Sequence, residues 1–167
     1  MEARERDAPP AVDRPQDFWR AVLAGRASLI VLYMMDPMER VSLVRAGIPS
    51  ALLVRLSERM AISKEQLYAT IGVPRATANR KLREHKPLSP QESERLLGVA
   101  RLVGQVEAMV RDSGNPERFD AARWVAGWLQ TPQAALGGQR PADLMDTAEG
   151  RELVSDLLAR MLSGAYA

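Results

Sequence analysis

The stretch WVAGWLQTPQAALGGQRPADLMDTAEG, residues 124–150, is dense in residues that constrain the path of the backbone. Trp124 and Trp128 stand four residues apart, so they would lie on one face of a helix. Phe119 and Leu129 widen the same apolar stripe. We therefore expect an amphipathic helix in this region, packed on a core by its aromatic face.

Local signals mark both ends of this helix. Asn115 and Pro116 predict its start, because Asn is a favoured N-cap and Pro fits the first helical turn. Thr131 and Pro132 predict its end, since a residue before proline avoids the helical conformation. The Leu-Gly-Gly sequence of residues 136–138 then predicts a tight connection with positive φ angles.

A short turn and a last helix follow this connection. Pro141 predicts the start of the turn, and either Asp146 or Thr147 would cap the helix after it. Gly164 is the expected stop, because glycine is favoured just beyond helix C-termini. The apolar positions of the last helix have helical spacing: Leu153, Val154, Leu157, Leu158, Met161 and Leu162. By periodicity alone, the region is a compact three-helix module.

Upstream, the segment ISKEQLYATIGVPRATANRKL contains a predicted helix-turn-helix over residues 63–83. Ser63 and Gln66 have the spacing of a capping box and would begin the first helix. Gly72 suits the tight turn, and Pro74 suits the start of the second helix. Four residues are expected to face the core: Leu67, Ile71, Ala78 and Leu82.

The second helix of this motif would expose polar and basic side chains. Such side chains suit a DNA major groove, where Arg recognises guanine, Asn recognises adenine, and Thr and Lys bind phosphate. The expected DNA-binding residues are Arg75, Thr77, Asn79, Arg80, Lys81 and Arg83. An ordinary solvated helix is the alternative interpretation. Tyr68 stands where related motifs place a small Ala, so either the first helix is rotated or DNA affinity is weakened.

A long amphipathic helix is predicted after His85. Ser89 would cap it, with Pro90 in the first turn and Glu92 three residues after the cap. Its buried side would be made by Leu96, Leu97, Ala100, Val103, Val106 and Val110. The polar run over residues 112–116 is the expected joint between two modules.

The predicted fold is all-α. Residues 1–16 are charged and rich in proline, so we expect them to be disordered. The apolar run 29–35 cannot be assigned by pattern alone, and we favour a buried helix because no other segment offers a strand partner. Two more helices are expected within residues 37–60. The chain then divides into a DNA-binding and dimerisation domain over residues 17–111 and a smaller domain over residues 112–167.

Composition argues against catalysis. The 167 residues include no cysteine, which excludes thiolate chemistry and fits a reducing cytoplasm. The single histidine, His85, argues against a metal site or a catalytic triad, and no apolar run is long enough to span a bilayer. Three acidic pairs are explained as helix caps or solvated surface: Glu92/Glu94, Asp143/Asp146 and Glu149/Glu152. We predict a soluble cytoplasmic protein that is not an enzyme, uses no cofactor or metal, and binds no membrane.

Charge is unevenly distributed along the chain. Residues 75–111 carry eight Lys and Arg against four Asp and Glu, a net charge of +4. Residues 112–167 carry five against eight, a net charge of −3. A basic centre beside an acidic C-terminal third predicts two different partners.

The C-terminal third closely resembles the toxin-binding domain of the Xre/MbcA/ParS antitoxin family. The resemblance covers about 45 residues and rests on Trp128-Leu129, Pro132, Leu136-Gly137-Gly138, Pro141, Leu144, Thr147, Glu149-Gly150 and residues 154–164. The "Leu-Ser-x-x-Glu-Ser" start of the long central helix resembles the same family. The resemblance implies a type II antitoxin with an Xre-like helix-turn-helix, whose partner is a RES-domain toxin that consumes NAD or ADP-ribosylates a protein.

The resemblance also implies where the toxin would bind. The expected toxin-binding residues are Trp128, Leu136, Gly138, Pro141, Leu144, Glu149, Leu158, Tyr166 and Ala167. The tail after Gly164 would place an aromatic ring and a carboxylate over the active site of the toxin, although a frayed terminus is the simpler alternative.

These features define the expected function. The protein would neutralise its toxin and repress its own operon by binding operator DNA as a homodimer or higher oligomer, since the run 29–35 offers more apolar surface than one bundle hides. The alternatives are a stand-alone transcription regulator whose C-terminal domain binds a ligand or dimerises, and an interaction protein that has lost DNA binding.

Overall fold

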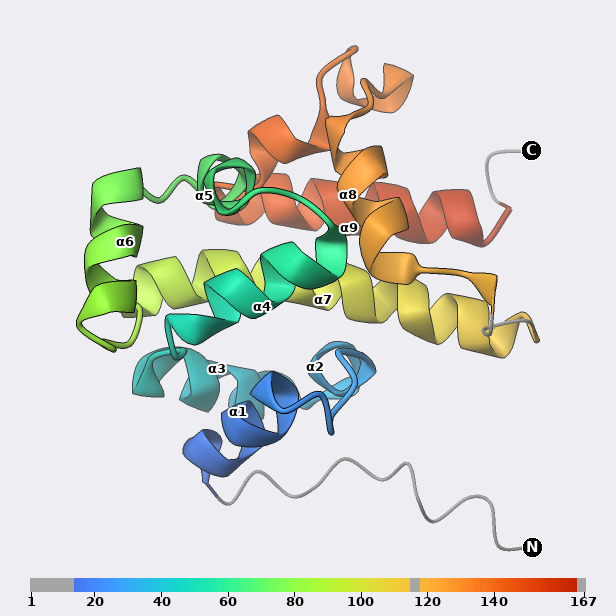
Figure 1. The fold of residues 1–167 in the computed structure, drawn as a ribbon. Coiled ribbons are helices and arrows are strands. Elements are labelled where there is room, and N and C mark those ends of the chain that lie inside the picture. Colours follow the sequence, from blue (N-terminus) through green and yellow to red (C-terminus); the bar gives the residue numbers. More distant parts are fainter. Residues whose placement is uncertain (1–13, 115–117, 165–167) are drawn as a thin grey trace, which may run out of the picture.

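The computed structural model describes residues 14–114 and 118–164, and every regular element in these ranges is a helix, as predicted (Figure 1). Two short segments in this part of the chain, around Pro49 and Pro87, meet in a single antiparallel bridge. The α-helices are α1 (Pro15–Leu23), α2 (Ile30–Met34), α3 (Pro37–Ala46), α4 (Ala51–Met60), α5 (Lys64–Ile71), α6 (Arg75–Arg83), α7 (Pro90–Asp112), α8 (Ala121–Gln130) and α9 (Ala148–Leu162). Two 3-10 helices, η2 (Ala134–Leu136) and η3 (Pro141–Leu144), lie between α8 and α9.

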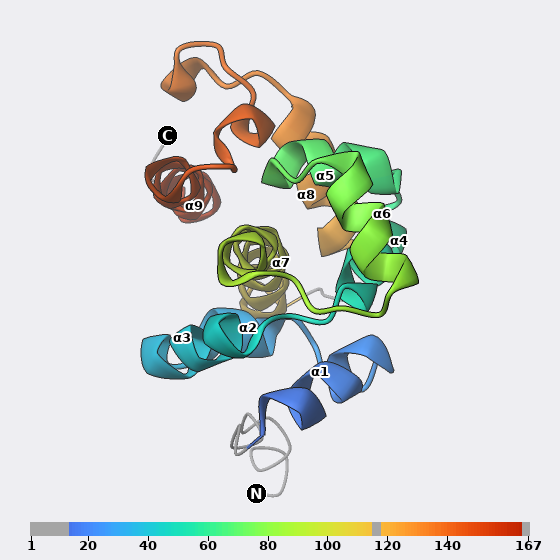
Figure 2. The ribbon, with the colours of Figure 1, turned by 90° about the vertical axis from the view of Figure 1, so that its left-hand side faces the viewer.

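The 23-residue helix α7 is the centre of the fold. Figure 2 shows it nearly end-on, with α2 and α3 below, α9 above, and α4, α5 and α8 to the right. Its start was correctly predicted, because Ser89 and Glu92 form a reciprocal capping box and Pro90 occupies the first turn. Gly104 permits the closest contact of α7, since a Cβ at this position would lie 2.1 Å from the carbonyl oxygen of Leu29.

The N-terminal helices cover the lower face of α7. Helix α1 begins at Pro15, so the last two residues of the segment expected to be disordered are helical, while residues 1–13 lie outside the described part of the chain. The run 29–35 forms α2, which confirms a helix there. Only one face of α2 is buried, because Leu32 faces α7 whereas Met34 is 62% exposed.

Helix α8 begins later than the sequence predicts. Its N-cap is Asp120, whose side chain accepts a hydrogen bond from the backbone N–H of Arg123 at 3.0 Å. Asn115 and Pro116 precede α8 and fall outside the described residues. The predicted end is confirmed, since Thr131 is the C-cap.

The C-terminal helix α9 follows η3, the turn predicted at Pro141. Of the two predicted caps, Thr147 is the one used, and it accepts from the N–H of Gly150 at 3.0 Å. The apolar stripe of α9 was predicted correctly for Val154, Leu157 and Leu158, which are all buried. Leu153 is an error in that stripe: it lies at the edge of the buried face and is 52% exposed.

The two predicted domains share one core. Helix α8 packs against α4 as well as against α7, and α9 packs against α7. The buried cluster therefore continues from Phe18 in α1 to Leu158 in α9. Side-chain packing therefore joins the two halves directly.

Candidate functional site

The helix-turn-helix predicted over residues 63–83 is formed by α5 and α6. The side chain of Ser63 caps α5 by accepting from the N–H of Gln66 at 3.0 Å. Gly72 takes the left-handed conformation at the turn, with φ of 63°. Val73 and Ala78 are buried between the helices, so the motif has the expected core.

Tyr68 is accommodated inside this motif rather than displaced from it. The ring is buried, and the hydroxyl donates a hydrogen bond to Oδ1 of Asn79 at 3.2 Å. Burial raises the pKa of Tyr68, and the nearby Glu65 raises it further against the effect of Arg75. The hydroxyl therefore stays protonated and ties α5 to the recognition helix α6.

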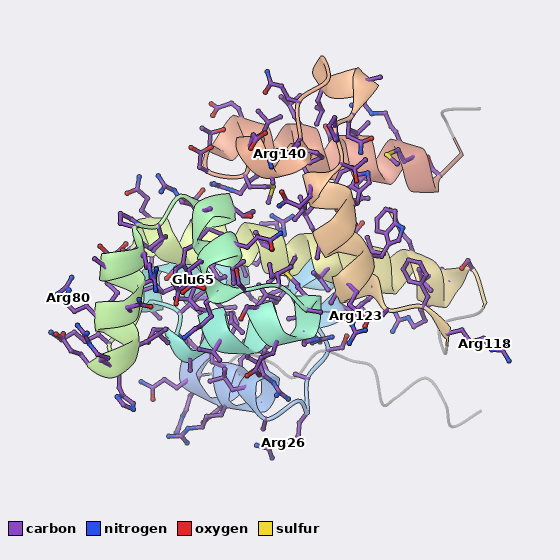
Figure 3. All side chains as sticks on the ribbon, turned by 45° about the horizontal axis from the view of Figure 1, so that its top comes forward. Arg26, Glu65, Arg80, Arg118, Arg123 and Arg140 are labelled. Atoms are coloured by element: carbon purple, nitrogen blue, oxygen red, sulfur yellow. The ribbon has the colours of Figure 1, made fainter. Side chains whose placement is uncertain are left out.

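The outward face of α6 carries the exposed cations. Arg80 and Arg83 are exposed, and Figure 3 shows Arg80 projecting away from the body of the protein. Arg75 is also exposed and lies 3.6 Å from Glu65 of α5. Thr77 and Asn79 are half-buried and flank this face. These side chains stand on a rigid helix, the arrangement that suits a major groove.

Lys81 is not exposed with these cations, which corrects the expected position of its side chain but leaves its DNA-binding role untested. Its Nζ lies 2.5 Å from Oε2 of Glu92, and the two side chains are only 14% and 16% exposed. Burial alone would raise the pKa of Glu92, but the hydrogen bonds from Lys81 and Ser89 outweigh it and lower that pKa. Lys81 thus joins α6 to the capping box of α7.

The turn of the helix-turn-helix also touches the C-terminal third. Nη1 of Arg95 donates to the carbonyl oxygen of Gly72 at 3.0 Å. A Cβ at Gly72 would lie 3.0 Å from Cβ of Asp146, the residue before the cap of α9. The candidate DNA-binding motif is therefore in contact with the start of α9.

The residues expected to bind a toxin separate into two groups. Trp128, Pro141 and Leu158 are buried and pack within the core of the domain. Trp128 also stacks on Trp124 with ring centroids 6.1 Å apart. The remaining described residues of the set reach the surface: Leu136 and Leu144 are half-buried, and Gly138 and Glu149 are exposed. Tyr166 and Ala167 lie outside the described residues.

Local contacts and glycine backbone angles determine the conformation of the loop between α8 and α9. Gly137 and Gly138 have φ angles of 65° and 81°, which confirms the predicted positive-φ connection. Arg140 pairs with Asp143 at 2.7 Å, and the hydrogen bond from Arg140 lowers the pKa of Asp143. Arg140 is not among the residues predicted to form a site, although its spacing of three residues from Asp143 is a usable signal.

Two further features bear on chemistry. Within residues 14–114 and 118–164, no group of three or more His, Cys, Asp and Glu side chains is placed to hold a metal ion. None of the described helices is long and apolar enough to cross a membrane.

These observations define a helix-turn-helix protein in which the recognition helix and a second helical domain are built on one core. Residues 39–101 match the antitoxin Xre-like helix-turn-helix domain, and residues 105–164 match the antitoxin Xre/MbcA/ParS C-terminal toxin-binding domain. The chain belongs to the Xre/MbcA/ParS family of type II antitoxins. The two matched regions meet inside α7.

Several characterised proteins are similar to this chain. It is 40% identical over 136 residues to the Prs ADP-ribosylating antitoxin of a Sphingobium species. This match covers 81% of this chain and 86% of the relative. It is 25% identical over 121 residues to antitoxin Xre of Pseudomonas putida, covering 71% and 67% of the two chains. It is 29% identical over 106 residues to antitoxin Xre of Yersinia enterocolitica, covering 64% and 66%.

Proposed function

We propose that this antitoxin neutralises a RES-domain toxin that consumes NAD, by covering its active site. The observation that carries the proposal is the toxin-binding domain over residues 105–164, in a chain 40% identical to a protein named Prs ADP-ribosylating antitoxin. Transfer of ADP-ribose takes that group from NAD, so an ADP-ribosylating toxin and an NAD-consuming toxin share the same substrate.

The proposed toxin-binding surface is the exposed side of the C-terminal third. Gly138 and Glu149 are exposed there, and Leu136 and Leu144 are half-buried at the same end of the domain. The net negative charge of residues 112–167 favours a basic surface on the toxin. The tail that follows Gly164 is proposed to enter the nucleotide pocket of the toxin.

We further propose that α5 and α6 repress the operon that encodes the pair. Arg80 and Arg83 would reach base edges or phosphates from the outward face of α6, with Arg75, Thr77 and Asn79 at its flanks. Homodimerisation would place two recognition helices about 34 Å apart, one turn of DNA. Met34 and Met38 are 62% and 69% exposed, and they offer an apolar face for that contact.

In this proposal the protein acts by binding alone, without a cofactor, in the cytoplasm where operator DNA and NAD are both present. A stand-alone transcription regulator is the competing function. The toxin-binding domain would then have no protein partner.

One experiment tests the proposal. The protein is co-expressed with the toxin encoded beside its gene, and cellular NAD and growth are measured. We expect the antitoxin to restore both, and we expect purified antitoxin to shift the promoter fragment in a gel. Unchanged NAD depletion in the presence of folded antitoxin contradicts the neutralisation, and promoter binding without neutralisation favours the stand-alone regulator.

A further inference from the structure

A groove of about 790 Å³ runs along α7 between α3 and α9. Figure 2 shows α3 and α9 on the same side of α7. The α3 wall presents Arg40 and Val41, the α7 floor presents Arg101 and Leu102, and the α9 wall presents Ser155. None of the six residues predicted to bind DNA lines this groove, so it is separate from the helix-turn-helix surface.

Arg101, on the floor of this groove, has a buried nitrogen that lacks an acceptor. Its Nε is buried and has no hydrogen-bond partner in the described part of the chain. Its guanidinium also pairs with none of the carboxylates that the structure describes. A buried N–H without an acceptor destabilises a fold, because its lost hydration is not replaced by a protein contact.

A second cation beside Arg101 makes this arrangement more costly. Arg40 faces the groove from α3 and donates to the carbonyl oxygens of Leu32 and Met35. Burial lowers the pKa of Arg40, and the positive charge of Arg101 lowers it further, against the opposing effect of Asp36. The two guanidinium groups therefore repel each other, and Nη1 of Arg40 is engaged by the two carbonyl oxygens.

The cation on the opposite wall is also occupied. Arg151 of α9 lies 2.8 Å from Glu94 and donates to the carbonyl oxygen of Met145. Arg101 is thus the cation on the floor of the groove with unused donors. A guanidinium with unused donors matches a carboxylate, which it binds through two parallel hydrogen bonds.

We propose that this groove is a docking site for a segment of the toxin, and that a carboxylate of that segment pairs with Arg101. The inference rests on the proposed function, because it assigns part of the toxin interface. It extends that interface beyond the C-terminal third, since one wall of the groove is α3.

Three observations favour a toxin segment as the occupant. The α9 wall belongs to the region that matches the toxin-binding domain, so the groove continues the surface already assigned to the toxin. Val41 on the rim is 37% exposed and Leu102 lies on the floor, which favours a peptide segment over a small hydrophilic anion. Three carboxylates also line the groove, those of Glu94, Glu152 and Asp156, and none of them pairs with Arg101. The unused donors of Arg101 therefore favour an acidic residue within that segment.

The test replaces Arg101 with Met, which keeps an unbranched apolar side chain and removes the charge. Binding to a catalytically inactive form of the toxin encoded beside this gene is measured by calorimetry, and thermal unfolding is followed for the free protein. We expect the affinity for the toxin to fall at least about thirtyfold, because the partner carboxylate would be left buried and unpaired. We expect the melting temperature of Arg101→Met to be unchanged or higher.

This combination separates a binding role from a structural one. A purely structural arginine would lower the melting temperature when removed, and any loss of affinity would follow that loss of folding. Arg26→Met is the matched control, because Arg26 is exposed on the loop between α1 and α2, and it should bind the toxin as the wild type does. Arg101→Lys should retain part of the affinity, since the charge is kept but the two-pronged geometry is lost.

Four outcomes would overturn the proposal. Affinity of Arg101→Met within about threefold of wild type excludes the groove while leaving the proposed function intact. A lower melting temperature with a matching loss of affinity makes Arg101 structural. A change from dimer to monomer in sedimentation, with toxin binding preserved, assigns the groove to a second copy of this chain. Failure of the wild type itself to bind the toxin contradicts both the proposed function and the groove.

Discussion

The hydroxyl of Tyr68 donates a hydrogen bond to Oδ1 of Asn79, 3.2 Å away, and so links the two helices of the helix-turn-helix. One acceptor position of Asn79 is thereby used inside the protein. The bond restricts the orientation of the Asn79 side chain and leaves the donors of its amide nitrogen for the proposed contact with DNA.

The first prediction is that Tyr68→Phe changes the base preference of the protein more than its overall DNA affinity. The ring is retained, so folding should lose only about 1 kcal/mol, the usual contribution of one hydrogen bond. Competition binding against operator variants measures the preference, and denaturant unfolding measures the stability. Tyr33→Phe is the control, because Tyr33 lies on α2 away from α6. An unaltered ranking of operator variants would show that the bond does not orient Asn79.

The second prediction separates two neighbouring cations of α6. Arg80→Ala should weaken operator binding by about 1–3 kcal/mol if Arg80 reads a base, with little effect on folding. Lys81→Met should instead lower the free energy of unfolding by about 1.5–3 kcal/mol, because Lys81 bonds to Glu92. The dependence of DNA binding on salt should not change in Lys81→Met. A flatter salt dependence of DNA binding in Lys81→Met would show that Lys81 does bind a DNA phosphate.

The third prediction concerns pH. The pKa of Glu92 is lowered in the folded protein, so its carboxylate contributes stability above its usual pKa of 4.5, and this contribution is lost as the pH falls toward the lower folded value. Glu92→Gln should therefore be less stable than wild type at neutral pH, and the difference should shrink below about pH 4. Urea titrations across this range measure it. A constant difference at every pH would mean that the charge of Glu92 is not the cause.

The fourth prediction compares two helical glycines. In Gly104→Ala the new Cβ would lie 2.1 Å from the carbonyl oxygen of Leu29, so α2 must move away from α7. We expect a loss of about 1–3 kcal/mol, as for other overpacked cores. Gly127→Ala is the control, because nothing lies within 4 Å of its Cβ position, and it should gain up to about 1 kcal/mol from helix propensity. Equal effects of the two substitutions would contradict the close contact.

Elements with strong local chemistry were predictable from the sequence. Ser63 and Ser89 were predicted as caps, and Thr147 as one of two candidates with Asp146, because a hydroxyl before a helical pattern satisfies an exposed N–H wherever the helix lies. The start of α8 was misplaced for the same reason. Asn115 and Pro116 are as good a local signal as Asp120, and the sequence does not say which one lies beside the packed helix.

The candidate sites depended more on tertiary contacts. The helical spacing of α6 correctly predicted that Ala78 is buried. It could not predict the bond of Lys81 to Glu92, because Glu92 lies on α7 and comes close to Lys81 only in the folded protein. Trp128 and Leu158 were assigned to a partner surface by resemblance, although residues typical of a domain often serve its own core. The groove beside Arg101 has walls more than one hundred residues apart in the chain, so no local pattern reveals it.

Helix α7 runs without interruption through the point, between residues 101 and 105, where the two matched regions meet. A helix advances about 100° per residue, so inserting a single residue there would rotate all later side chains by that angle relative to the earlier ones. The buried residues after the insertion would turn away from α2 and α9. If relatives exchange toxin-binding regions, the junction in α7 must therefore keep the same number of residues, so that the buried side chains still face the core. The helix-turn-helix half and the toxin-binding half are for this reason expected to be inherited together.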